Sequence, residues 1–218
     1  MAHMKVTKLG HCAMVLEIDG VKILTDPGSF TAQAQEKVSG LDAVVFTHEH
    51  QDHYHTDSLK KIIANNPTAL IIGNQTMAKL IGESLADTQV VVVGDGQSTT
   101  VKDVKVEGYG RDHALVYPPD AGLCENTAYF IGDKFYFPGD NFHNPGKKVD
   151  VLALPVAGPW MKISDAVDFA KLLKPRAAFG VHDGTIQPFF RGYVGMLLKN
   201  FVPEVQYTAI EDGATMEF

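Results

Sequence analysis

Short apolar runs separated by turn residues fill the first quarter of the chain, with the two-residue period typical of strands. Three of them predict strands, over Lys5–Leu9, Ala13–Ile18 and Val21–Thr25. An Asp19-Gly20 pair between the last two predicts a tight hairpin turn. A fourth run, Ala43–Phe46, stops at Thr47. We therefore expect a β-meander, then a buried strand whose carboxyl end leads into a polar loop.

The middle of the chain changes to a strand–helix–strand pattern. Thr56-Asp57-Ser58 offers an N-cap for a helix that runs to about Asn65. A further helix, from about Gln75 to Leu85, separates the apolar runs Ala69–Ile72 and Val90–Val93, as in a parallel α/β unit. Shorter strands return after Gly94, and the chain then forms a hairpin. Its strands are Thr127–Ile131 and Lys134–Phe137.

The last third repeats the α/β pattern. A buried strand over Val149–Leu154 precedes a helix that Ser164 caps and that ends near Lys174, followed by a strand over Ala177–Val181. No repeat, linker or low-complexity segment divides the chain. We expect two sheet-and-helix halves in one domain over residues 5–218. The opening Met1-Ala2-His3-Met4 looks like a cloning remnant, so His3 is left out of the site.

Composition agrees with one globular domain and narrows its partners. The 218 residues are 45% hydrophobic and 21% charged, enough to bury a full core without disulfides. A net charge of −7, spread along the sequence, gives no reason to expect affinity for nucleic acid or anionic membranes. Two cysteines, Cys12 and Cys124, and no leader-like segment favour a cytoplasmic protein. A homo-oligomer is left open.

The densest chemistry lies in the loop after Thr47, which reads His48-Glu49-His50-Gln51-Asp52-His53. Three imidazoles and a carboxylate within six residues are side chains that bind borderline first-row cations. On an extended strand end His48 and His50 point the same way and can reach one ion, while Asp52 and His53 can reach a second. The alternative is a solvated polar loop, which would not require so many imidazoles.

Two cations need more ligands than one loop supplies. Candidates are His113, Asp140 and His182, each of which follows or closes a strand-like run. Taken alone, each such residue is more often an ordinary polar group.

Together these motifs resemble the metallo-β-lactamase superfamily, whose signature His-x-His-x-Asp-His is followed by separate His, Asp and His motifs. The resemblance spans essentially the whole chain and implies an α/β fold, a four-layer αββα sandwich of two mixed sheets with helices outside. It implies that His48, His50 and His113 hold one metal, that Asp52, His53 and His182 hold the second, and that Asp140 bridges them. Asp26 matches the family's early aspartate, which supports the metal loop.

The branch is indicated by the opening Leu9-Gly10-His11-Cys12-Ala13 and by Leu24-Thr25-Asp26-Pro27. Both are similar to the minimal branch that contains ascorbate phosphate lactonase and many uncharacterised bacterial hydrolases. His113 lacks the Gly-His-Thr-x-Gly turn of thiolesterases and true β-lactamases, which argues against glyoxalase II activity and antibiotic hydrolysis.

Several other residues keep two interpretations. His11 either hydrogen-bonds a metal-bound group or is a structural turn residue, and Asp183, like Asp26, is expected to fix a histidine tautomer from behind the ligands. Trp160 is either a wall of the substrate site or a packing residue. Neither cysteine is assigned a catalytic role, and the loop Pro118–Glu125 is expected to overhang the site.

Two metals about 3.5–4 Å apart lower the pKa of a bridging water and polarise the substrate. We therefore expect a hydrolase in which the bridging hydroxide attacks an ester, lactone or phosphodiester bond of a small molecule, with anionic substrates included and nucleic acid disfavoured. Asp52 is the expected catalytic residue, orienting the hydroxide and accepting its proton. Zinc is expected first, and manganese, iron or nickel would suit the same ligands. The alternative is an iron-dependent redox enzyme on the same ligand set.

Overall fold

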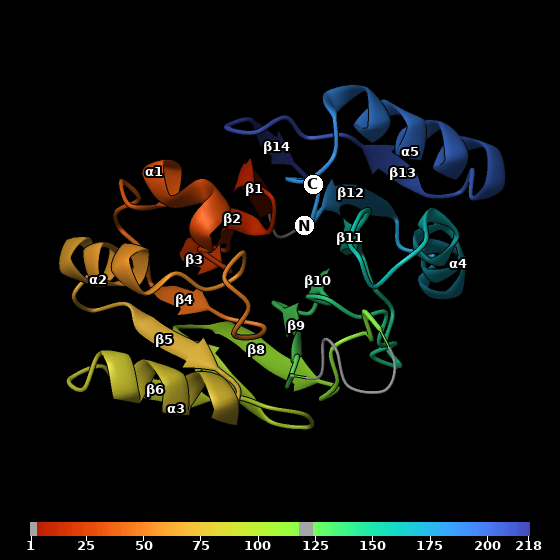
Figure 1. The fold of residues 1–218 in the computed structure, drawn as a ribbon. Helices are drawn as coiled ribbons and strands as arrows, with labels where there is room; N and C mark the ends of the chain where they lie inside the picture. The colour runs from red at the N-terminus through yellow and green to blue at the C-terminus, as the bar shows by residue number, and fades with distance from the viewer. Residues whose placement is uncertain (1–3, 118–123) are drawn as a thin grey trace.

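Two seven-stranded sheets face each other, and helices cover their outer sides (Figure 1). The structure, a computed structural model, describes residues 4–117 and 124–218. The first sheet, here the N-terminal sheet, has the order β14-β1-β2-β3-β4-β5-β6. Its strands are β1 Met4–Gly10, β2 Ala13–Ile18, β3 Val21–Thr25, β4 Ala43–Val45, β5 Leu70–Gly73, β6 Val90–Val92 and β14 Thr215–Glu217.

The C-terminal sheet has the order β13-β12-β11-β10-β9-β8-β7. Its strands are β7 Ser98–Val101, β8 Val104–Tyr109, β9 Ala128–Ile131, β10 Phe135–Phe137, β11 Val151–Pro155, β12 Ala177–Val181 and β13 Gln206–Thr208. Both sheets are mixed. In the N-terminal sheet β14, β1, β2 and β3 pair antiparallel and β3 to β6 pair parallel. In the C-terminal sheet β7 to β10 pair antiparallel and β10 to β13 pair parallel.

Alternation along the strands builds three apolar layers. In β4, Val45 belongs to the core between the sheets, whereas Val44 packs in the core shared with the helices outside. In β12, Phe179 belongs to the core between the sheets, and Ala178 packs in the core shared with the helices outside the second sheet. The outer helices are α2 Thr56–Asn65 and α3 Gln75–Ser84 on the first sheet, and α4 Ile163–Leu173 and α5 Pro188–Phe201 on the second. The four-layer αββα sandwich is thus confirmed.

Several boundaries differ from the prediction. His55 occupies the N-cap position of α2, in place of a residue of the 56–58 run, and its side chain makes no capping hydrogen bond to the backbone. Its Nδ1 lies 2.9 Å from Ser58 Oγ instead. α4 follows Lys162 instead of Ser164, because Asp165 Oδ2 accepts a hydrogen bond from Lys162 N at 2.7 Å. The strand predicted over 149–154 is β11, shifted by one or two residues.

Five elements were not predicted. They are η1 Ser29–Thr31, α1 Ala32–Gln35, α5 and the short strands β13 and β14.

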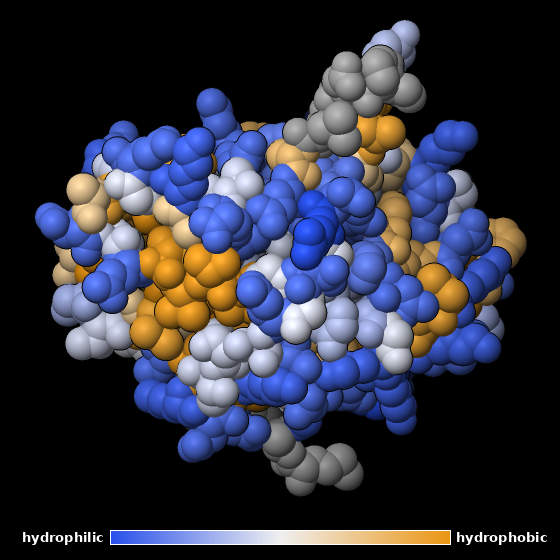
Figure 2. Space-filling view, turned by 90° about the horizontal axis from the view of Figure 1, so that it is seen from below, coloured by the Kyte–Doolittle hydropathy of each residue, from blue (hydrophilic) through white to orange (hydrophobic). Residues whose placement is uncertain are grey.

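The outer surface is mostly polar on the side that carries α3 and β8 at the bottom of Figure 1. Figure 2 shows that side, with a large apolar area on the left of the view and smaller ones on the right among hydrophilic side chains. Within residues 4–117 and 124–218, no helix is both long and apolar enough to cross a membrane.

Candidate metal centre

The histidine-rich loop starts where β4 ends, and a fully buried carboxylate holds it there. Asp26, directly after β3, accepts a hydrogen bond from Thr47 N at 2.8 Å on Oδ1. Its Oδ2 accepts a second one from Thr47 Oγ1 at 2.6 Å, and His53 Nδ1 lies 2.7 Å from the same oxygen. Asp26 therefore orients both ends of the loop 48–53.

The segment after β3 also packs directly against this loop. A Cβ added to Gly28 would lie 1.9 Å from the Asp52 carbonyl oxygen, so only glycine allows the approach. Next to it, Ser29 N donates a hydrogen bond to Gln51 O at 2.7 Å. The backbone of the loop is thereby fixed independently of its histidine side chains.

The first group of side chains that could hold a cation combines three imidazoles and a thiol. The ligand atoms of His48, His50, His113 and Cys124 all lie within 4.8 Å of one another. His48 Nε2 and His50 Nδ1 are 3.2 Å apart. The first two histidines follow β4, whereas His113 follows β8 of the other sheet. The first group therefore takes its ligands from both sheets.

The second group consists of His11, Asp52, His53 and His182, with ligand atoms again within 4.8 Å of one another. Asp52 Oδ2 lies 3.0 Å from His11 Nε2, 3.4 Å from His182 Nε2 and 3.7 Å from His53 Nε2. Three imidazoles thus converge on one carboxylate oxygen. This group also spans the sandwich, because His11 follows β1 and His182 follows β12.

Asp140 lies between the two groups. Its Oδ2 is 3.3 Å from His113 Nε2, in the first group, and 2.9 Å from His182 Nε2, in the second. Asn126 Oδ1 accepts a hydrogen bond from Asp140 N at 3.0 Å, and Trp160 Nε1 donates one to Asp140 Oδ2 at 2.8 Å. The carboxylate is therefore held by groups behind it while it faces both clusters.

The backbone is strained where these side chains are presented. His11, Asp26 and His182 have φ angles of 49°, 34° and 57°, the left-handed region that non-glycine residues rarely adopt. Each such residue costs about 1–2 kcal/mol. Strain of this kind collects at functional sites, where it fixes the direction of a side chain.

The two groups differ in the pKa values of their histidines. Burial lowers the pKa of His48 well below its ordinary value, with a further contribution from His53, and burial also lowers the pKa of His50. In the second group burial acts in the same direction, but the Asp140 carboxylate outweighs it. The pKa of His53 is raised well above its usual range, and that of His182 is raised to about 9. Without metal, His48 and His50 are thus neutral near pH 7, whereas His53 and His182 hold protons.

Several buried polar atoms here lie within ion-pair distance of one another, yet none of them makes a hydrogen bond of suitable geometry in the part of the chain that the structure describes. They are His53 Nε2, His113 Nε2, His182 Nε2 and Asp140 Oδ1. An unsatisfied buried polar group costs about 1–3 kcal/mol. Imidazole nitrogens and carboxylate oxygens are also the ligands that divalent first-row cations prefer. The donor set therefore fits two cations, one in each group with Asp140 between them.

The residues predicted as ligands are thus brought together by the fold, with three departures around them. Asp183 contacts Lys8 and Arg191 instead of a ligand histidine, with its Oδ2 3.0 Å from Arg191 Nε. Trp160 serves as the hydrogen-bond donor to Asp140, a role that the sequence did not reveal. Cys124 joins the first group although no role was expected for it. Most of the loop predicted to overhang the site, residues 118–123, lies outside the described residues.

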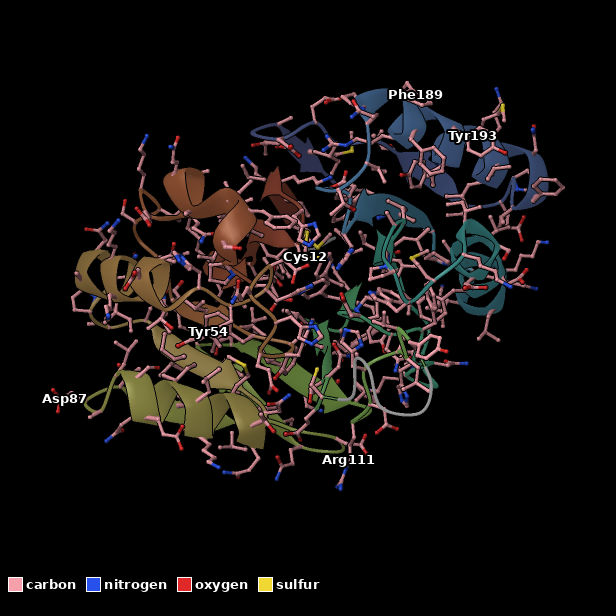
Figure 3. The ribbon with its side chains drawn as sticks, in the orientation of Figure 1. Cys12, Tyr54, Asp87, Arg111, Phe189 and Tyr193 are labelled. Atoms are coloured by element: carbon pink, nitrogen blue, oxygen red, sulfur yellow. The ribbon has the colours of Figure 1, made fainter. Side chains whose placement is uncertain are left out.

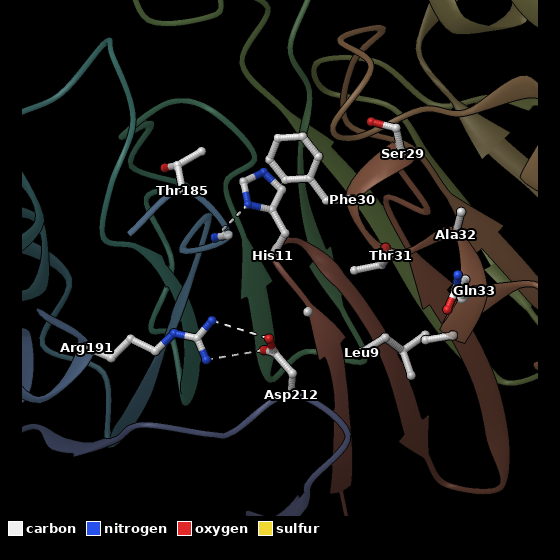
Figure 4. Close-up of a pocket in the computed structure, with 13 residues that line it drawn as sticks. Leu9, His11, Ser29, Phe30, Thr31, Ala32, Gln33, Thr185, Arg191 and Asp212 are labelled. Atoms are coloured by element: carbon white, nitrogen blue, oxygen red, sulfur yellow. Dashed lines mark hydrogen bonds and ion pairs between the residues drawn. The ribbon is translucent and has the colours of Figure 1, made fainter. Parts of the chain in front are cut away.

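A cavity of about 710 Å³ opens beside the second group (Figure 4). Its wall includes the His11 ring, and Nε2 of this ring lies 3.0 Å from Asp52 Oδ2 in the second group. The Phe30 ring lies 4.9 Å from the His11 ring, and Thr31 and Thr185 add hydroxyl groups to the lining. The cavity therefore adjoins the metal-ligand cluster and is large enough for a small molecule.

Residues 5–182 match the family described as the beta-lactamase superfamily domain. The chain belongs to this superfamily. Protein Rv0786c of Mycobacterium tuberculosis is 34% identical over 97% of this chain and all of its own length. A UPF0173 metal-dependent hydrolase of Aeropyrum pernix is 28% identical and covers 83% of each chain. The solved structure of Igni18, a metallo hydrolase from Ignicoccus hospitalis, superposes with a TM-score of 0.75, at 21% identity over 99% of this chain and 98% of its own.

Membership of the metallo-β-lactamase superfamily confirms the resemblance seen in the sequence. The superfamily's two-sheet architecture explains why the candidate ligands sit at strand ends. In this chain they follow β4, β8, β10 and β12, strands that belong to both sheets. Membership of the superfamily does not identify the substrate, which has to be inferred from the chemistry of the site itself.

Proposed function

We propose that this protein is a metal-dependent hydrolase that uses two divalent cations to cleave an ester, lactone or phosphodiester bond of a small molecule. The class of metal-dependent hydrolase is the one that relatives of this chain bear in their names. The proposed ligands are His48, His50 and His113 for one cation, and Asp52, His53 and His182 for the other, with Asp140 between them. Zinc is the first choice of metal, because imidazole predominates in both groups.

The observation that carries the proposal is the pair of side-chain groups on either side of Asp140. Each group offers four ligand atoms within 4.8 Å of one another, and ring nitrogens of His113, His53 and His182 are buried without a hydrogen bond of suitable geometry among the described residues. A solvated polar loop would leave such atoms in contact with water. A cation in each group would satisfy them.

Two bound cations would supply Lewis acidity, which lowers the pKa of water and polarises the scissile bond. The chain's own residues add orientation. Asp52 is the most open of the central carboxylates, with 25% of its side chain exposed, and its pKa is held far below the usual range despite partial burial, chiefly by the hydrogen bond with His11. Ionised at every physiological pH, it orients the attacking water through Oδ1, because Oδ2 already faces His11 and His182.

The cavity beside His11 is the proposed place for the body of the substrate. Its volume of about 710 Å³ and its mixed lining, with the Phe30 ring next to threonine hydroxyls, suit a small polar metabolite. The net charge of −7 disfavours nucleic acid as substrate. These features leave lactones, phosphodiesters and other esters as the classes to screen.

The test compares Asp52→Ala with Asp57→Ala, a matched change five residues later where the carboxylate is 72% exposed. Both are loaded with zinc, their metal content is measured, and turnover is followed on a phosphodiester and a lactone panel. We expect Asp57→Ala to behave as wild type and Asp52→Ala to lose turnover with its fold retained. Wild-type rates in metal-replete Asp52→Ala would contradict the assignment.

Metal analysis also separates the redox alternative. Stoichiometric iron with a redox-active spectrum in anaerobically purified protein would favour oxygen or sulfur chemistry. About two zinc or manganese ions per chain, lost in His48→Ala and Asp140→Ala, would favour hydrolysis. No specific metal would contradict both.

A further inference from the structure

Cys124 is placed opposite His113 by a short piece of sheet. Asp112 and Glu125 form an isolated antiparallel bridge. Within it His113 N donates a hydrogen bond to Cys124 O at 3.1 Å, and Asn126 N donates to Arg111 O at 2.9 Å. The backbone of Cys124 is therefore in fixed register with that of a candidate ligand.

Two neighbours anchor this bridge to the rest of the fold. Glu125 Oε2 accepts hydrogen bonds from Thr76 N at 3.0 Å and from Thr76 Oγ1 at 2.8 Å, at the start of α3. On the other side, Asn126 binds the backbone of Asp140 and donates to Pro138 O at 3.0 Å. Cys124 thus lies on a segment tied both to the N-terminal sheet's helix and to the central carboxylate.

The first group holds one more donor than the three histidines proposed as its ligands. His48, His50 and His113 supply three imidazoles, Asp140 lies between the two groups, and the thiol of Cys124 stands among the same ligand atoms. The His113 side chain is only 1% exposed, and its Nε2 makes no hydrogen bond of suitable geometry among the described residues. Cys124 Sγ lies within 4.8 Å of a ring nitrogen of each of the three histidines.

We propose that Cys124 is a further ligand of the first cation, beside His48, His50 and His113 and with Asp140 between the two cations. The inference rests on the proposed function, since it presupposes a cation held by the three histidines. A thiolate makes the site soft, so it selects zinc over manganese or magnesium.

Cys12 supplies a matched control inside the same chain. It is 1% exposed, lies between the two sheets (Figure 3), and its Sγ lies within 4.8 Å of ligand atoms of His53 and Asp140. The second group, however, already offers four ligand atoms without it. Each cysteine lies beside candidate ligands, but only replacement of Cys124 is expected to change the binding of the metal.

The experiment uses cobalt in place of zinc, because thiolate coordination to cobalt(II) produces a charge-transfer band in the near ultraviolet. Wild type, Cys124→Ser, Cys12→Ser and the double variant are loaded with cobalt(II), the bound metal is counted, and spectra are recorded. In parallel, iodoacetamide labels the cysteines of metal-free and zinc-loaded wild type, and peptide mass spectrometry reads each site.

We expect the band in wild type and in Cys12→Ser, and its loss in Cys124→Ser and in the double variant. Zinc should protect Cys124 from alkylation, and Cys124→Ser should lower zinc affinity at least about tenfold, the loss that even outer-sphere partners produce. Two bound cobalt ions without a thiolate band would overturn this inference alone, as would a band lost only in Cys12→Ser. No bound cobalt would overturn the proposed function together with it.

Discussion

Replacing Asp26 with asparagine exchanges one buried oxygen for an NH₂ group at the point where both metal groups are oriented. In the wild type, Asp26 Oδ2 faces His53 Nδ1 directly, and it also accepts the hydroxyl proton of Thr47, whose Oγ1 lies 2.9 Å from His48 Nδ1. A carboxylate there favours the tautomer with hydrogen on Nδ1 in both rings. Nε2 of each ring is then free to bind a cation, one in each group.

The size of the effect follows from these contacts. In Asp26→Asn the Oδ1 acceptor for Thr47 N is kept, so the loop can still fold, but the new NH₂ group opposes a hydrogen on His53 Nδ1. Loss of such an outer-sphere partner lowers metal affinity about 10–100-fold. That corresponds to roughly 1.4–2.7 kcal/mol for the second cation, with a smaller loss for the first through Thr47.

Zinc affinity is measured by chelator competition in wild type, Asp26→Asn and the exposed control Asp57→Asn. Urea unfolding of the metal-free proteins shows whether the fold survives. We expect Asp57→Asn to match wild type and Asp26→Asn to hold its second zinc about 10–100-fold more weakly. Wild-type affinity for both ions in a folded Asp26→Asn protein would refute the tautomer argument.

Three further predictions concern protonation, burial and the cavity. Burial would lower the pKa of His182, but Asp140 and Asp52 outweigh it and raise the pKa to about 9. The stability contributed by protonated His182 is therefore complete below about pH 6.5 and lost as pH rises through about 9, which urea unfolding of the metal-free protein will show. Lys8→Met should lower the free energy of unfolding by about 3 kcal/mol, because the 2%-exposed Asp183 loses one buried partner yet keeps Arg191; a loss under about 1 kcal/mol would contradict the ion pair's role. Phe30→Ala should raise KM with little change in kcat, and an unchanged KM would remove the cavity from the substrate path.

The local part of the site could be predicted because short sequence patterns determine it. The run 48–53 is dense enough in imidazoles to indicate metal, and the apolar strand before it places it at a strand end. His113, Asp140 and His182 are far apart in sequence, so only the resemblance to a known family connected them. The structure brings them within reach because the strands before them end at the same place.

The rest depended on register and on contacts between distant segments. Cys124 faces the first group only because residues 111–113 pair with 124–126, which no local pattern reveals. Asp183 meets Lys8 across the two sheets, a contact that could not be expected from its position beside His182. α5 escaped prediction because Gly192 and Gly195 weaken its helix pattern and because apolar Phe189 and Tyr193 lie exposed on it (Figure 3).

The division of each ligand group between the two sheets has a consequence for how the protein is made. When residues up to 53 have left the ribosome, either group holds only part of its ligands, since His113 and His182 are still to be synthesised. A nascent chain therefore cannot retain a metal tightly, and capture becomes a late event that follows the meeting of the two halves. Metal ions then bind the protein after its synthesis is complete. Once bound, they link two halves of the chain that were synthesised at different times.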